Sequence, residues 1–190
     1  MTAFVSIAIA LLIGGLLLAC VRTPAPGQAL VRTGLGSTRA TTGSVLVLPG
    51  VHQSESLDLT LTRIPLSFRG PNNPLISADQ QLFDLEISLF FRVSAEESAI
   101  LQAINHFSAQ TLNDEPALVA AISDDVAQSI RTIAGNCSWS QIQSQPDDFK
   151  SSLSERLTIL TPGLAVDSIA LDHIDKFPPD ISSRQSTRLL

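Results

Sequence analysis

The sequence is poor in cysteine and in charge: it has two cysteines, and charged residues make up 16% of the 190 positions. Cys20 and Cys137 lie far apart and neither belongs to a CxxC or Cys/His cluster, which excludes a disulfide framework and indicates no metal site. The GxGxxG and GxSxG motifs are absent, and the short "GLG" at 34–36 precedes no helical pattern. Nucleotide binding and a hydrolase-type serine are therefore not expected.

Acidic residues are missing from the first 54 positions. Residues 22–54 carry a charge of +3 from Arg22, Arg32 and Arg39, and because the whole chain carries −6, the remainder carries −9. Such an acidic body repels nucleic acid, and no basic stripe with interleaved aromatic residues reverses this. We expect no nucleic-acid partner.

One long apolar run precedes the arginines. Residues 3–21 contain Ser6 as their only polar side chain, and as a helix they would span about 28 Å, close to the thickness of the hydrocarbon core. We predict a transmembrane anchor over residues 1–21. Because arginines flank only its C-terminal end, the positive-inside rule predicts a single-pass protein of the cell membrane with its folded part in the cytoplasm.

Cys20 leaves an alternative open. Ala19 before Cys20 and Leu17 two residues earlier would suit a lipoprotein-type cleavage site, although Leu18 is a poor residue within one and a signal peptide wants a basic start. Cleavage there would give a lipidated extracytoplasmic binding protein. In an uncleaved chain, Cys20 stands at the cytoplasmic end of the apolar helix, where S-acylation is a further option.

Residues 22–27 read as a short Pro-containing linker, and period-two alternation follows it. Strands are predicted in "ALVRT" and "SVLVLP", with a turn between them. Further strands are predicted over 56–64, in a short piece of 69–79, and over 82–93, where alternate residues from Phe83 to Val93 face inward and Asp84, Glu86 and Ser88 face water. The pattern indicates a half-buried, mostly antiparallel sheet.

The period then changes to that of helices. A capping box of Ser94 and Glu97 predicts a helix start, and amphipathic helices are predicted over 94–107, 114–135 and 145–160, with a short helix or turn over 138–143. A closing strand is predicted over 164–175. The order of elements indicates an α+β domain over residues 28–177, followed by a disordered tail over 178–190.

No catalytic constellation emerges from the remaining polar residues. "DHID" at 172–175 is the most reactive-looking cluster, but Asp172 and Asp175 would face opposite sides of a strand, and His173 reads as a surface histidine. Ser54 follows His52 in an extended stretch in which the two side chains would not meet. We expect no enzyme, no cofactor and no metal.

Three features in order resemble the flotillin-like branch of the stomatin/prohibitin/flotillin (SPFH, band 7) domain family. They are the entry "ALVRTG…LVLPGVHQ" after an apolar anchor, the strand-to-helix change at "FRVSAEES", and the series from "SIRTIAG" and "SWSQIQ" to the strand "VDSIALDHI". The resemblance runs from about Gly27 to Asp175. It implies a non-enzymatic scaffold that self-associates and organises membrane microdomains with their associated proteins.

Members of that family usually continue into a long coiled coil, whereas "KFPPDISSRQSTRLL" has no heptads, so weak self-assembly is expected. The expected partners are the lipid bilayer, a second copy or a longer flotillin-like paralogue, and a membrane protease or transporter, of which this chain would be a regulatory subunit. Arg22, Arg32 and Arg39 are the expected contacts with anionic headgroups, where each cationic side chain contributes about 1 kcal/mol.

Overall fold

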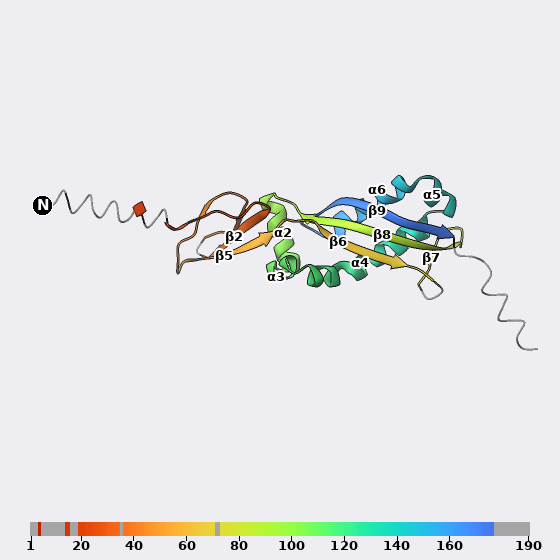
Figure 1. The fold of residues 1–190 in the computed structure, drawn as a ribbon, viewed down its shortest axis with the longest axis horizontal. Coiled ribbons are helices and arrows are strands. Elements are labelled where there is room, and N and C mark those ends of the chain that lie inside the picture. The colour runs from red at the N-terminus through yellow and green to blue at the C-terminus, as the bar shows by residue number, and fades with distance from the viewer. Residues whose placement is uncertain (1–3, 5–13, 16–18, 35, 71–72, 177–190) are drawn as a thin grey trace, which may run out of the picture. The chain divides into compact units, whose positions relative to one another are not determined.

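A computed structural model describes residues 4, 14–15, 19–34, 36–70 and 73–176 (Figure 1). The predicted anchor over residues 1–21 lies mostly outside this part of the chain, and the predicted tail over 178–190 lies wholly outside it. Within the described ranges, no helix has the length and apolar character that crossing a membrane requires. The chain folds as two compact units. Unit 1 contains the residues up to Thr60 with 92–118 and 162–164, and unit 2 contains the rest.

The strands of unit 1 form two small antiparallel sheets. β1 (Val21–Arg22) pairs with β4 (Val45–Leu46), and β2 (Gln28–Gly34) lies between β3 (Arg39–Thr41) and β5 (His52–Asp58). The strand predicted in "ALVRT" is confirmed by β2, but the turn predicted after it contains β3, and of "SVLVLP" only Val45–Leu46 forms a strand, which pairs with β1. Val21 and Arg22 stand in a strand, however, and not in the anchor and the linker to which the sequence assigned them.

Alternation along β2 decides which face of its sheet is buried. Ala29 and Val31 are buried together with their cross-strand partners Leu57 and Ala40. Helices α2 (Glu97–Phe107) and α3 (Ala109–Asn113) pack against β3 and β5, and they complete this core with Ile100, Ala103, Ala109 and Leu112. The other face of β2, which carries Leu30 and Arg32, is turned away from this core.

The start of α2 corrects the predicted capping box. The helix begins at Glu97 after Glu96, without a side-chain cap. The backbone N–H of Ser94 donates to the carbonyl of Gly163, which holds Ser94 before the helix. Gly163 itself has φ +85, and a Cβ there would collide with the backbone of Ala99 and Ala103. Only glycine fits this approach of backbone to helix.

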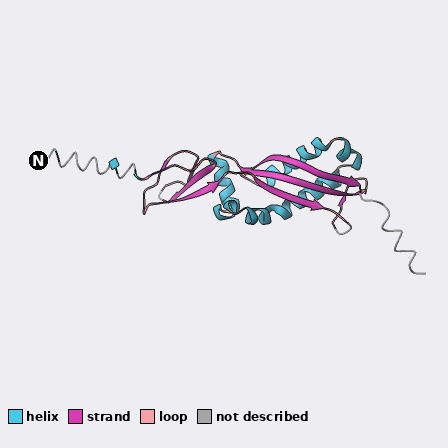
Figure 2. Cartoon of the chain, in the orientation of Figure 1, coloured by secondary structure: helices cyan, strands magenta, loops and turns pink. Residues whose placement is uncertain are grey.

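Unit 2 contains a four-stranded antiparallel sheet. β8 (Leu82–Val93) pairs with β6 (Thr62–Phe68), with the short β7 (Leu75–Ile76) and with β9 (Leu164–Lys176) (Figure 2). The strand predicted over 56–64 is wrong, because that stretch is divided between β5 and β6. The Asp58 carboxylate accepts the N–H of Thr60 at 2.9 Å, and this local turn ends β5 and leaves Leu61 48% exposed.

The predicted faces of β8 are confirmed for its apolar residues: Phe83, Leu85, Ile87, Leu89, Phe91 and Val93 are all buried. Helices α4 (Glu115–Asn136), α5 (Trp139–Ser144) and α6 (Pro146–Leu160) bring matching stripes, with Ile122, Val126 and Ile130 on α4 and Phe149, Leu153 and Leu157 on α6. α5 begins with a true capping box of Ser138 and Gln141. α4 ends at Asn136, so Gly135 is its penultimate residue rather than its stop.

Candidate functional site

The three arginines of the acid-free stretch all lie in unit 1. Arg32 on β2 and Arg39 on β3 are directly opposite each other in the register, on the face turned away from Val31 and Ala40. One guanidinium nitrogen of Arg32 donates to the carbonyl of Leu46 at 3.2 Å. Arg22 follows Val21 on β1 and is exposed. The structure therefore brings Arg32 and Arg39 together, whereas Arg22 belongs to a separate ribbon.

Apolar side chains adjoin this arginine pair. Leu46, whose carbonyl binds Arg32, is the cross-strand partner of Val21, and these two side chains are 37% and 43% exposed. Among the described residues no carboxylate forms an ion pair with Arg32 or Arg39. Val21, Leu46 and Arg39 are exposed and Arg32 is half-buried, and we call this group of two apolar and two cationic side chains the basic-apolar surface.

Cys20, the predicted lipidation site, immediately precedes this surface. Cys20 is buried, with 6% of its surface exposed, and its carbonyl oxygen accepts the backbone N–H of Val47 at 2.8 Å. This hydrogen bond lies next to the residue pairs that join β1 and β4. An acyl chain on the Cys20 sulfur would fit only if the residues packed around this side chain moved apart. The sequence had placed this cysteine at the end of an apolar helix and contained no signal for its burial beside β4.

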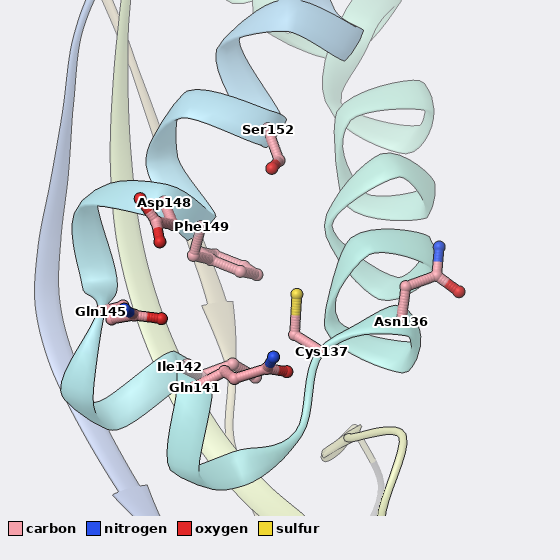
Figure 3. Close-up of a pocket in the computed structure, with 8 residues that line it drawn as sticks. All are labelled: Asn136, Cys137, Gln141, Ile142, Gln145, Asp148, Phe149 and Ser152. Carbon is pink, nitrogen blue, oxygen red and sulfur yellow. The ribbon is translucent and has the colours of Figure 1, made fainter.

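Cys137 lies in a cavity of unit 2 with a volume of about 170 Å³ (Figure 3). Its sulfur points toward the ring of Phe149, and Gln141, Gln145 and Asp148 line the space from α5 and α6, while the side chain of Asn136 points away. Burial raises the pKa of the Cys137 thiol. A raised pKa keeps this thiol protonated at neutral pH, so Cys137 is a poor nucleophile.

The histidines do not assemble a reaction centre. His173 pairs with Asp175 at 2.9 Å on β9, two residues away along the same face. The Nδ1 of His52 accepts the N–H of Leu48 at 3.2 Å, and Ser54 is one of the residues around a separate cavity of about 570 Å³ between the sheet and α2. Within the described ranges, no group of three or more His, Cys, Asp or Glu side chains could hold a metal ion.

A polar row across the sheet of unit 2 was missed by the sequence reading. The Ser88 hydroxyl donates to Asp172 on β9 at 2.6 Å and accepts from Arg63 on β6 at 2.9 Å. Ser88 was predicted to face water, but it is 1% exposed because these two long side chains cover it. Since no substrate can reach this hydroxyl, the row ties three strands together and offers no nucleophile.

A second polar cluster holds the start of α5. The Asp79 carboxylate accepts the Ser77 hydroxyl at 2.5 Å and the backbone N–H of Trp139 at 3.0 Å. These hydrogen bonds, that of Ser77 first, lower the pKa of Asp79. Trp139 packs its ring against Phe83 with centroids 5.4 Å apart. This cluster stabilises the fold.

Comparisons with known proteins identify a relative and a family for this chain. The chain is similar to the flotillin family inner membrane protein YqiK of Escherichia coli (strain K12), with 24% identity over 178 residues. The alignment covers 92% of this chain and 32% of that relative, so the chain spans about a third of its length. Residues 23–189 match the SPFH domain / Band 7 family. The chain belongs to the SPFH domain / Band 7 family, as the resemblance of its ordered motifs predicted.

Proposed function

We propose that this chain is a non-enzymatic, membrane-anchored scaffold of the flotillin type, which gathers membrane proteins and lipids into patches. The observation that carries the proposal is the direct succession of an apolar segment over residues 3–21 and the basic-apolar surface of unit 1, within a chain of the SPFH family. An apolar segment of that length attaches the chain to a bilayer, and the cationic side chains that follow it suit a headgroup region.

The positions of the arginines also indicate on which side of the membrane the folded part lies. Arg22, Arg32 and Arg39 stand after the apolar segment and no basic side chain stands before it, which supports a cytoplasmic folded part and a single pass. The name of the relative, an inner membrane protein, supports the same type of location for this chain. The partners that we propose are the bilayer, a second copy or a longer flotillin-like paralogue, and a membrane protease or transporter that the chain regulates.

The alternative of a lipidated extracytoplasmic protein has less support. It needs residue 20 as a modified N-terminus, and the thiol of Cys20 is buried in unit 1. Mass analysis of the N-terminus of the purified full-length chain separates the two: an intact N-terminal segment agrees with the anchored scaffold, whereas a chain beginning at lipid-modified Cys20 contradicts it.

The scaffold itself is tested by membrane fractionation with crosslinking. Full-length chain in native membranes should resist carbonate extraction and should crosslink to neighbouring copies and to other membrane proteins. Leu11→Arg/Leu12→Arg, which puts two charges into the apolar segment, should release the chain, since each Arg there costs about 2.5 to 3.5 kcal/mol. A native chain that carbonate releases as a monomer contradicts the proposal.

A further inference from the structure

We propose that the arginine pair Arg32–Arg39 binds the phosphate of an anionic phospholipid, and that Val21 and Leu46 beside it contact the adjoining acyl region. This inference rests on the proposed membrane attachment and deepens it, because it assigns a lipid class to one surface of unit 1.

The first argument is the cross-strand register. Arg32 and Arg39 face each other directly on β2 and β3, and like charges in that arrangement destabilise a sheet unless an anion lies between them. Among the described residues neither arginine forms an ion pair, although guanidinium groups are the side chains best suited to hold a phosphate by two hydrogen bonds. The pair is therefore a cationic site without an internal anion.

The nearest acids along this sheet do not neutralise the pair. Glu55 lies opposite Val31, so its side chain points to the core face. Asp58 shares the outer face but stands opposite Gln28, four residues or about 13 Å along β2 from Arg32, and its carboxylate accepts the N–H of Thr60. That separation exceeds the Debye length of about 8 Å at physiological salt. The positive charge is therefore presented to an external ligand.

The second argument selects a lipid rather than a free anion. The Arg32 guanidinium donates to the carbonyl of Leu46, and Leu46 pairs with Val21, so exposed apolar side chains adjoin the cationic pair. A phospholipid offers a charged phosphate next to apolar chains, in the same order as this surface. Val21 is also the last residue of the apolar segment, so the surface begins where the predicted membrane segment ends.

Native mass spectrometry of the full-length chain in detergent micelles tests the assignment, with dioleoyl phosphatidylglycerol and dioleoyl phosphatidylcholine as probes. The native chain should bind phosphatidylglycerol more tightly. Arg39→Gln should weaken phosphatidylglycerol binding about fivefold, and Arg32→Gln/Arg39→Gln about 25-fold. Phosphatidylcholine binding should fall less in both variants, because the choline group already balances the charge of its phosphate. The Arg39 side chain donates no hydrogen bond to the described residues, so Arg39→Gln should leave the fold intact even where Arg32→Gln disturbs Leu46.

The matched control is Arg156→Gln, which removes one exposed positive charge from α6 of unit 2 and should change neither affinity. Equal affinity for the two lipids, or an equal loss in Arg39→Gln and Arg156→Gln, would overturn the phosphate site while leaving membrane attachment in place. Release of the native chain by carbonate would instead refute the proposed anchored scaffold, so failures of the two proposals are distinguishable.

Discussion

Substitutions at three consecutive positions of β8 provide a quantitative test of unit 2. Ile87 is 1% exposed, and truncation to alanine removes buried carbons and leaves a cavity, which costs about 2 to 5 kcal/mol. Ser88→Ala removes a buried hydroxyl with two charged partners, at about 1 to 2 kcal/mol, because Arg63 and Asp172 keep access to water. Glu86→Ala removes a half-exposed ion pair with Arg69, at 2.9 Å, and costs less than about 1 kcal/mol.

Thermal unfolding of the full-length chain in detergent micelles, followed by fluorescence, measures these differences. Trp139 is the one tryptophan of the chain and contacts Phe83 on β8, so the signal reports unit 2. At about 2 to 4 °C per kcal/mol, Ile87→Ala should lower the midpoint by roughly 4 to 20 °C, Ser88→Ala by a few degrees and Glu86→Ala by less. Equal shifts for Glu86→Ala and Ile87→Ala would refute the assignment of faces. A silent Ser88→Ala would refute the argument that its hydroxyl joins three strands.

Three further predictions follow from unusual local environments. Gly163→Ala should unfold unit 1, seen as lost protection of its amides in hydrogen exchange, because φ is +85 and the added Cβ collides with α2. The control Gly43→Ala should be tolerated, because φ there is negative and there is room for a methyl group. Because the pKa of Asp79 is lowered in the folded chain, its charged form contributes stability above the ordinary pKa of 3.8, and this contribution is lost as the pH falls through the lower folded pKa. Asp79→Asn should therefore weaken the pH dependence of stability in acid, measured by Trp139 fluorescence. An unchanged pH dependence would contradict this. The raised pKa of Cys137 predicts that iodoacetamide alkylates it more slowly than a free thiol at about pH 7.5, and that Phe149→Ala accelerates the reaction. Alkylation of the native chain as fast as that of a free thiol would contradict the raised pKa.

β8 and α4 were predictable because their patterns are local, whereas the short β3 and α3 were not predicted. β8 alternates over twelve residues, and α4 repeats an apolar residue every four positions, so periodicity identified both elements and their buried faces. The family followed from the order of such elements. No long-range information was needed for these predictions.

The wrong predictions came from individual hydrogen bonds, which the periodicity of the sequence does not reveal. Leu57 and Leu61 continue one alternating pattern, yet the Asp58 side chain turns the backbone between them. Ser94 looked like a helix cap, but the carbonyl of Gly163, far away in sequence, binds its N–H. Ser88 looked exposed because the partners that cover it come from two other strands.

The candidate site was predictable only in part. The absence of acids before Glu55 singled out Arg22, Arg32 and Arg39 from composition. The direct pairing of two of them depends on the register of β2 with β3, and the contact of Arg32 with Leu46 depends on the fold of unit 1. Composition therefore identified the charges, and the structure identified the surface that they form.

Counting copies of the full-length chain in native membranes tests the scaffold most directly. Single-molecule photobleaching of a fluorescently labelled chain in native membranes should show spots that coincide with other membrane proteins more often than a single-span control does. Because self-assembly is expected to be weak, several bleaching steps should appear where the density of the chain is high or a longer paralogue is present. Single-step spots that diffuse independently of every other membrane protein would contradict the account.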